Sequence, residues 1–179
     1  MPFDTWVALK LEEDDKMFGL FKKDNKDKSI KLKSPVVGRC FDISEIPDEV
    51  FSTKMLGDGI GFESTDGVLY APADGEIVQV FPTKHAVILR TKDGIEILLH
   101  IGIDTVEMKG EGFETFVEKA QNVKAGDKLV SFDNDLIKAK AKSNLSALIL
   151  TDSESMESVE FNLGNVDTTN DVIIIKLKK

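Results

Sequence analysis

The fold is decided by residues 86–101, which read AVILRTKDGIEILLHI. Two apolar runs, residues 86–91 and 95–101, flank the turn Lys92-Asp93-Gly94, and this arrangement predicts a β-hairpin. His85 stands directly before the first run, and His100 stands near the end of the second. Because the strands of a hairpin run antiparallel, we expect the two imidazole rings to be near neighbours across the ladder.

On either side of this hairpin, the chain from Ser29 onward reads as many short strands. Runs rich in Val, Ile and Phe alternate with Gly, Asp-Gly and Pro at intervals of roughly 8 to 12 residues, which predicts an all-β antiparallel sandwich or barrel. The other expected strands cover residues 30–37, 67–70, 76–81 and 172–175. Two short helices are expected at residues 111–120 and 134–142, the second after the capping residue Asp133.

Two short segments of the sequence resemble each other. Residues 34–38 read SPVVG and residues 71–75 read APADG, so both have the pattern small-Pro-x-x-Gly and both precede an expected strand. Proline sets the direction of chain entry, and glycine permits a tight turn. The match is too short to prove a duplication, but it favours two related sheet halves over one continuous meander.

Composition excludes several classes of protein. The chain has 179 residues, which is enough for one domain with a core, and its net charge of −9 argues against nucleic-acid binding. Cys40 is the only cysteine, so no disulfide framework is expected and a cytoplasmic location is the default. No run approaches the roughly 18 apolar residues of a membrane span, and the start lacks the features of a secretory signal.

Residues 1–29 differ from the rest of the chain. They hold thirteen charged residues among scattered aromatic ones and have no pattern of a core element, so we expect a flexible leader before a domain at residues 30–179. Two interpretations of the leader stay open. Residues 17–23, MFGLFKK, suit one amphipathic turn that touches a membrane or a partner weakly, and a solubilising tail is the alternative.

The motifs that are missing narrow the chemistry. The chain has no nucleotide-binding loop, no dinucleotide fingerprint, no nucleophile elbow and no HExxH zinc motif. What remains is the pair His85 and His100, flanked by Thr83 and Asp104; a neutral imidazole is a competent nucleophile toward a phosphoryl group. Two ordinary, partly buried histidines are the competing interpretation. A metal site or metallohydrolase is a weaker one, because the spacing lacks a ligand pattern.

A family resemblance decides between these interpretations. Residues 100–113, HIGIDTVEMKGEGF, closely resemble the active-site signature of the glucose-type enzyme IIA domains of the bacterial phosphoenolpyruvate:sugar phosphotransferase system. The likeness extends from about Ser34 to Lys178. Besides the two Pro-Gly segments, it includes IPDxVF at 46–51, MxGDG at 55–59, TxHA at 83–86 and VxAGD at 123–127.

The resemblance implies a soluble phosphocarrier. A monomer is favoured because the sequence has no coiled-coil pattern and no long exposed edge pattern, and we expect no cofactor and no metal. His100 would accept phosphate from phospho-HPr through Nε2 and pass it to a cysteine of a sugar-specific IIB domain. His85 would stabilise the phosphoryl group, and Thr83 would orient the His85 ring. A regulatory binding module that uses the same face to control transporters or sugar kinases is the alternative function. The partner domains, rather than this chain, would determine which sugar is transported.

The resemblance also implies a partner-binding rim around the histidines. The rim would exclude water with apolar side chains and would meet basic residues of HPr with two acids. Family members often carry Phe at the position of Leu98, and this difference keeps the site apolar. The implied partner-binding residues are Asp48, Val50, Phe51, Phe81, Leu98, Asp104 and Val106.

Overall fold

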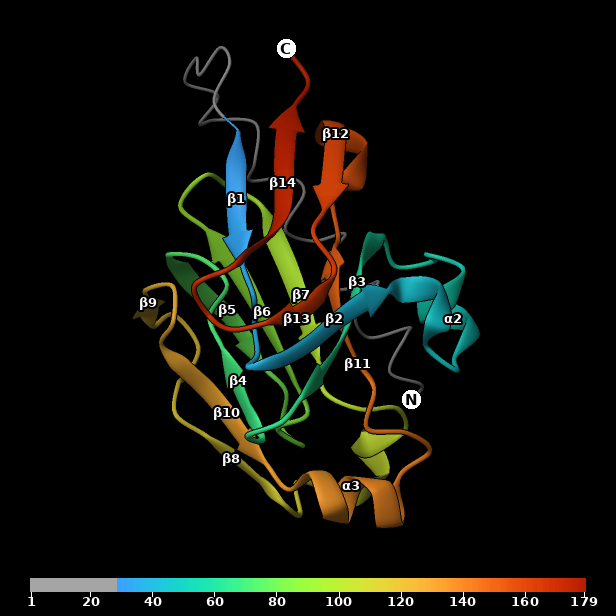
Figure 1. The fold of residues 1–179 in the computed structure, drawn as a ribbon. Helices are drawn as coiled ribbons and strands as arrows, with labels where there is room; N and C mark the ends of the chain where they lie inside the picture. Colours follow the sequence, from blue (N-terminus) through green and yellow to red (C-terminus); the bar gives the residue numbers. More distant parts are fainter. Residues whose placement is uncertain (1–28) are drawn as a thin grey trace.

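The structure, a computed structural model, describes residues 29–179, and antiparallel β-strands dominate them (Figure 1). The largest sheet has eight strands in the order β13-β2-β3-β11-β7-β6-β5-β9, and two three-stranded sheets have the orders β1-β14-β12 and β4-β10-β8. The strands are β1 Ile30–Lys33, β2 Gly38–Asp42, β3 Asp58–Ser64, β4 Val68–Tyr70, β5 Gly75–Val80, β6 Ala86–Thr91, β7 Glu96–His100, β8 Phe113–Thr115, β9 Asn122–Val123, β10 Lys128–Phe132, β11 Ser146–Leu150, β12 Met156–Phe161, β13 Gly164–Val166 and β14 Asp171–Leu177. The expected all-β antiparallel class is confirmed.

Helices in the described residues are short and connect strands. The two α-helices are α2, Glu49–Ser52, and α3, Asn134–Lys140. The 3-10 helices are η2, Ile43–Glu45, η3, Thr105–Met108, and η4, Ser153–Ser155. No helix in this part of the chain is long and apolar enough to cross a membrane.

The hairpin that the sequence predicts is present as β6 and β7. The Gly94 N–H donates to the Thr91 carbonyl at 2.9 Å, and Gly94 has a φ of +88°, the left-handed conformation that this turn requires. The strand expected at 30–37 is shorter than predicted. It ends at Lys33 because Pro35 has no N–H to continue a ladder, and the chain turns before β2 begins at Gly38.

One of the two expected helices is confirmed, and the other is wrong. Asp133 caps α3 by accepting a hydrogen bond from the Leu136 N–H at 2.9 Å, although the helix ends at Lys140 rather than at residue 142. Residues 111–120 instead contain β8, which pairs with β10. Phe113 is buried against Phe132 with ring centroids 6.4 Å apart, so pairing and core packing outweigh the weak helical pattern.

The two Pro-Gly segments lie side by side and are related as the internal similarity suggested. The Lys33 N–H donates to the Pro72 carbonyl, and the Tyr70 N–H donates to the Pro35 carbonyl, both at 2.7 Å. In each case the residue two before one proline binds the carbonyl of the other proline. Each segment then opens an antiparallel pair, β2 with β3 and β5 with β6. This reciprocal exchange supports a fold of two related halves.

The eight-stranded sheet buries apolar side chains on both faces, because successive residues of a strand point in opposite directions. On β7, Leu99 belongs to the main core, whereas Leu98 belongs to a smaller group that we call the second cluster. His100, two residues after Leu98, therefore lies on the face of the second cluster. The buried members of this cluster are Phe41, Ile43, Ile46, Phe51, Phe81, Ala86, Ile88, Leu98, Ile103, Ala147 and Ile149.

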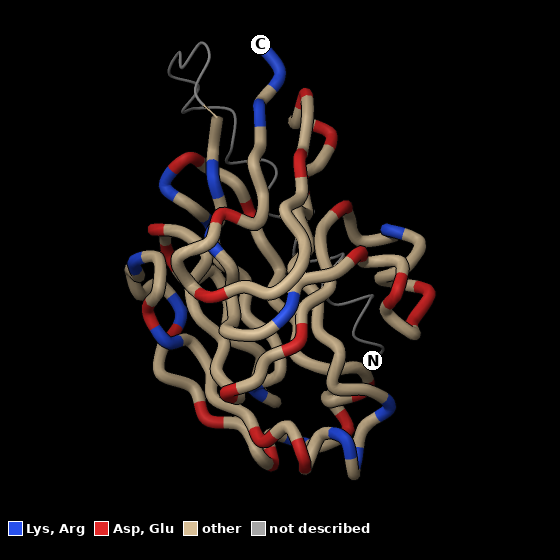
Figure 2. The backbone as a smooth tube through the Cα atoms, viewed as in Figure 1, with Lys and Arg blue, Asp and Glu red and all other residues tan. Residues whose placement is uncertain are grey.

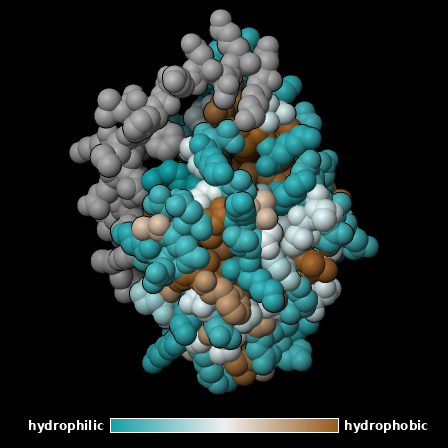
Figure 3. Space-filling view, turned by 90° about the vertical axis from the view of Figure 1, so that its left-hand side faces the viewer, coloured by the Kyte–Doolittle hydropathy of each residue, from teal (hydrophilic) through white to brown (hydrophobic). Residues whose placement is uncertain are grey.

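Where the described residues are visible in Figure 3, the surface is mostly hydrophilic. On the side that lies at the left of Figure 1, apolar surface is broken into small areas by hydrophilic side chains (Figure 3). Acidic residues gather along the segment that carries η2 and α2, where Asp42, Glu45, Asp48 and Glu49 follow closely in sequence (Figure 2). The expected leader, apart from Ser29, and its amphipathic turn at residues 17–23 lie outside the described residues.

Candidate active site

His100 is the last residue of β7, and small side chains surround it within the sheet. Its direct neighbours across the two ladders are Ala86 on β6 and Ala147 on β11, and both are completely buried. Methyl groups at these positions leave space for an imidazole ring on the same face. The ring is 5% exposed, so His100 sits at the edge of the second cluster with only a small opening to solvent.

His85 is placed by the turn that leads into β6. The Phe81 N–H donates to the Ala86 carbonyl at 3.0 Å, and the carbonyl of His85 itself accepts a hydrogen bond from the Ile101 N–H at 2.8 Å. The pairing of β6 with β7 brings the rings of His85 and His100 together, with centroids 5.0 Å apart and planes at 82°. The predicted proximity of the two histidines is confirmed.

Thr83 lies within hydrogen-bonding distance of the His85 ring. Its Oγ1 is 2.6 Å from Nδ1 of His85. When the hydroxyl donates to Nδ1, a neutral ring must carry its proton on Nε2. This contact therefore gives Thr83 the means to hold His85 in one orientation and one tautomer.

Burial keeps both histidines neutral at neutral pH. Desolvation lowers the pKa of His85 to about 4. The pKa of His100 falls to about 3, first through desolvation and then through the neighbouring His85, while a hydrogen bond with the Gly102 backbone acts in the opposite direction. A neutral imidazole keeps a lone pair on one ring nitrogen, so each ring is able to act as a nucleophile or as an N–H donor.

Two phenylalanines cover the histidine pair. The Phe51 ring lies 5.0 Å from the His100 ring, and the Phe81 ring meets the His85 ring edge-on at 5.8 Å. Phe51 reaches His100 from α2, whose first turn is capped by the Asp48 carboxylate through a 2.9 Å hydrogen bond from the Val50 N–H. The short helix therefore positions one wall of the site.

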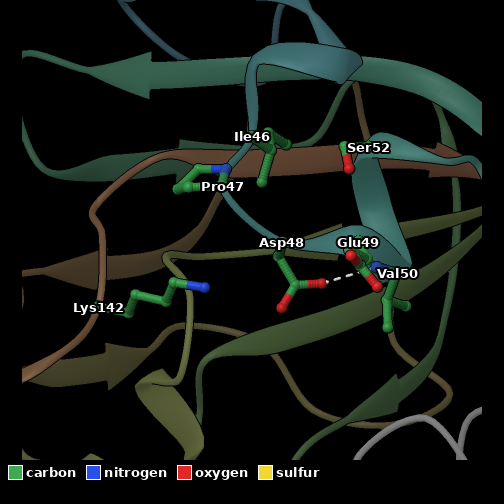
Figure 4. A pocket seen from close by; sticks show the side chains of 7 residues that line it. All are labelled: Ile46, Pro47, Asp48, Glu49, Val50, Ser52 and Lys142. Carbon is green, nitrogen blue, oxygen red and sulfur yellow. Dashed lines mark hydrogen bonds between the residues drawn. The ribbon is translucent and has the colours of Figure 1, made fainter.

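An open depression of about 510 Å³ adjoins this wall (Figure 4). Its lining combines the polar groups of Asp48, Glu49 and Lys142 with apolar ones, and Lys142 comes from the loop between α3 and β11. That loop touches the site because the Lys142 N–H donates to the Ile103 carbonyl at 3.2 Å. The lining residues are Ile46, Pro47, Asp48, Glu49, Val50, Ser52 and Lys142.

The other residues of the implied rim lie at different depths. Asp104 is exposed in a left-handed conformation with a φ of 60°, and Val106, in η3, is 36% exposed. Val50 is half-buried beside the depression. Leu98 differs, because its side chain is completely buried and cannot touch a partner in this structure. We therefore expect Leu98 to act by supporting the floor beneath the histidines.

Two buried hydroxyl residues at the site were not identified from the sequence. Ser146 is 1% exposed and accepts a hydrogen bond from the Gly102 N–H at 2.9 Å. Thr105 is completely buried and donates to the Ile101 carbonyl at 2.5 Å. A serine at the head of the apolar run SALIL was the available signal, since a buried hydroxyl needs a partner. Its partner, 44 residues away, could not be identified from the sequence.

Comparison with known protein families identifies the family to which this chain is similar. A family model described as the phosphoenolpyruvate-dependent sugar phosphotransferase system, EIIA 1, matches residues 30–156. The chain belongs to this family. As an EIIA protein, it is a phosphotransferase component of a sugar transport system. Among residues 29–179, no cluster of three His, Cys, Asp or Glu side chains is arranged to hold a metal ion.

Several relatives of this EIIA protein are similar over most of its length. The PTS system glucose-specific EIIA component of Bacillus cereus is 44% identical over 162 residues, covering 90% of this chain and 96% of the relative. That of Staphylococcus epidermidis is 45% identical over 144 residues, covering 80% and 86%. A solved structure, glucose permease IIA from Mycoplasma capricolum, is 40% identical with a TM-score of 0.79, covering 86% of this chain and 100% of that one.

In a further relative, the part that is similar to this EIIA protein belongs to a longer chain. The PTS system glucose-specific EIICBA component of Staphylococcus saprophyticus is 44% identical over 149 residues. These residues make up 83% of the present chain but 22% of the relative. The EIIA protein therefore resembles one part of a longer multidomain chain as well as free-standing proteins.

Proposed function

We propose that this EIIA protein accepts a phosphoryl group on Nε2 of His100 from phospho-HPr and transfers it to a cysteine of a sugar-specific IIB domain. The observation that carries the proposal is the His85–His100 pair, two neutral rings 5.0 Å apart under a cover of phenylalanines. Family membership supplies the reaction class, and the geometry supports the assignment of roles to individual residues.

His100 suits the role of phosphoryl acceptor. Its low pKa keeps the ring neutral, and its Nδ1 is buried inside the protein, so Nε2 is the nitrogen within reach of a partner. The Nε2 lone pair would form a bond to phosphorus as the bond from phosphorus to the donor histidine breaks. In the second step a cysteine thiolate of IIB would form an S–P bond while the N–P bond at His100 breaks.

His85 suits the role of phosphoryl stabiliser. A neutral His85 that accepts from Thr83 Oγ1 presents an N–H at Nε2, on a ring whose plane is nearly perpendicular to that of His100. Such a donor would stabilise the negative charge on the phosphoryl oxygens, both in the transition state and in the phosphorylated protein. Thr83 would act on the reaction through the orientation and tautomer of His85.

The apolar surroundings would protect the phosphohistidine from hydrolysis. Phe51 and Phe81 each lie against a histidine ring and are 5% exposed, so they limit the access of water from two sides. A partner docked over the remaining opening would exclude water during transfer.

HPr and a IIB domain are the partners that membership in the system implies. Asp48 lines the depression beside the site, Asp104 is exposed four residues after His100, and the net charge of −9 favours a basic donor protein. We further propose that the protein acts as a monomer in the cytoplasm. Weak membrane contact by the leader and control of other proteins through the same face stay predictions.

Incubation with phosphoenolpyruvate, enzyme I and HPr tests the proposal. We expect acid-labile phosphate on the wild-type protein and none on His100→Gln. Circular dichroism of both proteins controls for folding. An unphosphorylated wild-type protein, or a His100→Gln variant that is phosphorylated normally, would overturn the assignment.

A further inference from the structure

The backbone that follows His100 is held by a second, distant segment. The Gly102 N–H donates to Ser146 Oγ at 2.9 Å, and the same hydroxyl lies 3.2 Å from the Asn144 carbonyl, to which it donates. The next N–H, that of Ile103, donates to the Ser143 carbonyl at 2.8 Å. Both peptide groups around Gly102 are therefore attached to residues 143–146, immediately before and at the start of β11.

This attachment sets the direction of the Gly102 carbonyl. In a trans peptide the N–H of one residue and the C=O of the preceding residue point in opposite directions. Because the Ile103 N–H points toward Ser143, the Gly102 carbonyl points away from Ser143. That direction agrees with the hydrogen bond between the His100 ring and the Gly102 backbone, which raises the pKa of His100 against the stronger effect of burial.

Gly102 is confined to one conformation at this point. Its φ is +67°, and a Cβ atom there would lie 2.5 Å from Thr105 Cγ2 and 3.0 Å from the Ser143 carbonyl oxygen. The close packing leaves little freedom for the loop, and the buried Ser146 hydroxyl satisfies the N–H that this conformation directs into the protein.

We propose that Ser146 is a positioning residue that, through Gly102, fixes the tautomer of His100 and so makes Nε2 the nucleophilic nitrogen. The proposal rests on the role of His100 as phosphoryl acceptor. A ring whose Nδ1–H donates to the Gly102 carbonyl carries its lone pair on Nε2, the nitrogen that faces a partner. Without Ser146 the buried Gly102 N–H loses its acceptor, and Gly102 is held only through the bond from the Ile103 N–H to the Ser143 carbonyl. The Gly102 carbonyl is then positioned less firmly, and the His100 ring populates both tautomers.

The test compares Ser146→Ala with a matched control, Ser34→Ala. Ser34 is also completely buried and also hydrogen-bonded to backbone, but to Val36, far from the site. Ser146→Thr, which keeps the hydroxyl, serves as the rescue variant. Two quantities are measured for each protein: the tautomer of His100 from imidazole ¹⁵N chemical shifts, and the initial rate of phosphorylation by phospho-HPr.

We expect Ser146→Ala to shift His100 toward a mixture of tautomers and to lower the phosphorylation rate by about 10- to 100-fold, the loss known for metal-ligating histidines that lose their outer hydrogen-bond partner. Ser34→Ala should lose stability but keep both the tautomer and the rate, and Ser146→Thr should restore both. If Ser146→Ala does not fold, Ser146→Cys gives the same readouts, because a thiol is a weak acceptor.

An unchanged His100 tautomer in folded Ser146→Ala, or an unchanged phosphorylation rate, would overturn the inference. Failure of the proposed function looks different, since the wild-type protein itself would then carry no phosphate on His100. The tautomer measurement uses unphosphorylated protein, so it reports on Ser146 whatever the outcome for phosphoryl transfer.

Discussion

The rings of His85 and His100 lie 5.0 Å apart with their planes at 82°, although fourteen residues separate them in the chain. The β6–β7 hairpin creates this relationship, because its register places Ala86 directly opposite His100. His100 ends β7 and His85 directly precedes β6, so ladder hydrogen bonds keep the proposed nucleophile and the proposed N–H donor at a constant separation.

The first prediction concerns the separate roles of His85 and His100 in accepting and donating phosphate. We expect His85→Gln to accept phosphate from HPr but to pass it to IIB poorly, because the N–H that stabilises the transferring group is displaced. Rates of both half-reactions, measured separately with purified phospho-HPr and with IIB, check this. Full transfer to the IIB domain by His85→Gln would remove the supporting role.

The second prediction isolates the 2.6 Å contact between Thr83 and His85. Thr83→Val keeps the shape of the side chain but removes the hydroxyl, so the His85 tautomer is released and the rate of transfer to IIB should fall by about 10-fold or more. Thr83→Ser retains the hydroxyl and should stay near the wild-type rate. Equal rates for the Val and Ser variants would show that the hydrogen bond has no functional role.

The third prediction is a pH dependence of stability. Burial lowers the pKa of His85 to about 4 and that of His100 to about 3, below the ordinary value of 6.5. At pH values between the folded-state pKa of each histidine and 6.5, the unfolded chain binds more protons than the folded one. The histidines therefore contribute their whole share to the free energy of unfolding above about pH 6.5, and this contribution falls as the pH drops. At pH 5 the loss should be on the order of 2 kcal/mol for each histidine.

Urea unfolding at pH 7.5 and at pH 5 measures this loss. The double variant His85→Gln/His100→Gln is the control, and its stability should change less between the two pH values. Hydrogen bonds lower the pKa values of carboxyl groups such as Asp42 and Asp171 below the ordinary 3.8, so these groups titrate below this window. An equal pH dependence in the wild-type and double-variant proteins would contradict the prediction.

The fourth prediction concerns recognition of the phosphoryl donor. Asp104 is exposed four residues after His100 and caps no helix with its side chain, so its carboxylate is available to a basic partner. Asp104→Asn should raise the KM for phospho-HPr several-fold and leave kcat nearly unchanged, with an effect that shrinks at high salt. Glu157→Gln, an exposed acid on β12, should leave both constants unchanged.

Asp48 is less suitable for this experiment, although the family resemblance assigns it the same role. Its carboxylate caps α2, which carries Phe51 against His100. A substitution at Asp48 would therefore change both the charge of the rim and the position of one wall. A weaker reaction in Asp48→Asn together with a lower Tm would indicate that the cap, as well as the charge, contributes.

Features that depend on neighbouring residues could be predicted from the sequence alone. The Lys92-Asp93-Gly94 turn and its two apolar runs specify the β6–β7 hairpin, and the hairpin alone brings His85 close to His100. The Asp133 cap of α3 was equally readable, because a capping interaction spans three residues. These features follow from local backbone geometry, which a few adjacent side chains decide.

Features that join distant segments became known from the three-dimensional fold. Within residues 111–120, Phe113–Thr115 form a strand because they pair with β10, against a weak local preference for helix. Phe51 reaches His100 from another element, and Ser146 holds Gly102 across 44 residues. The sequence indicates which residues are able to make such contacts. Which of them meet depends on the packing of the sheets against one another, because burial and ladder pairing are optimised over the whole chain at once.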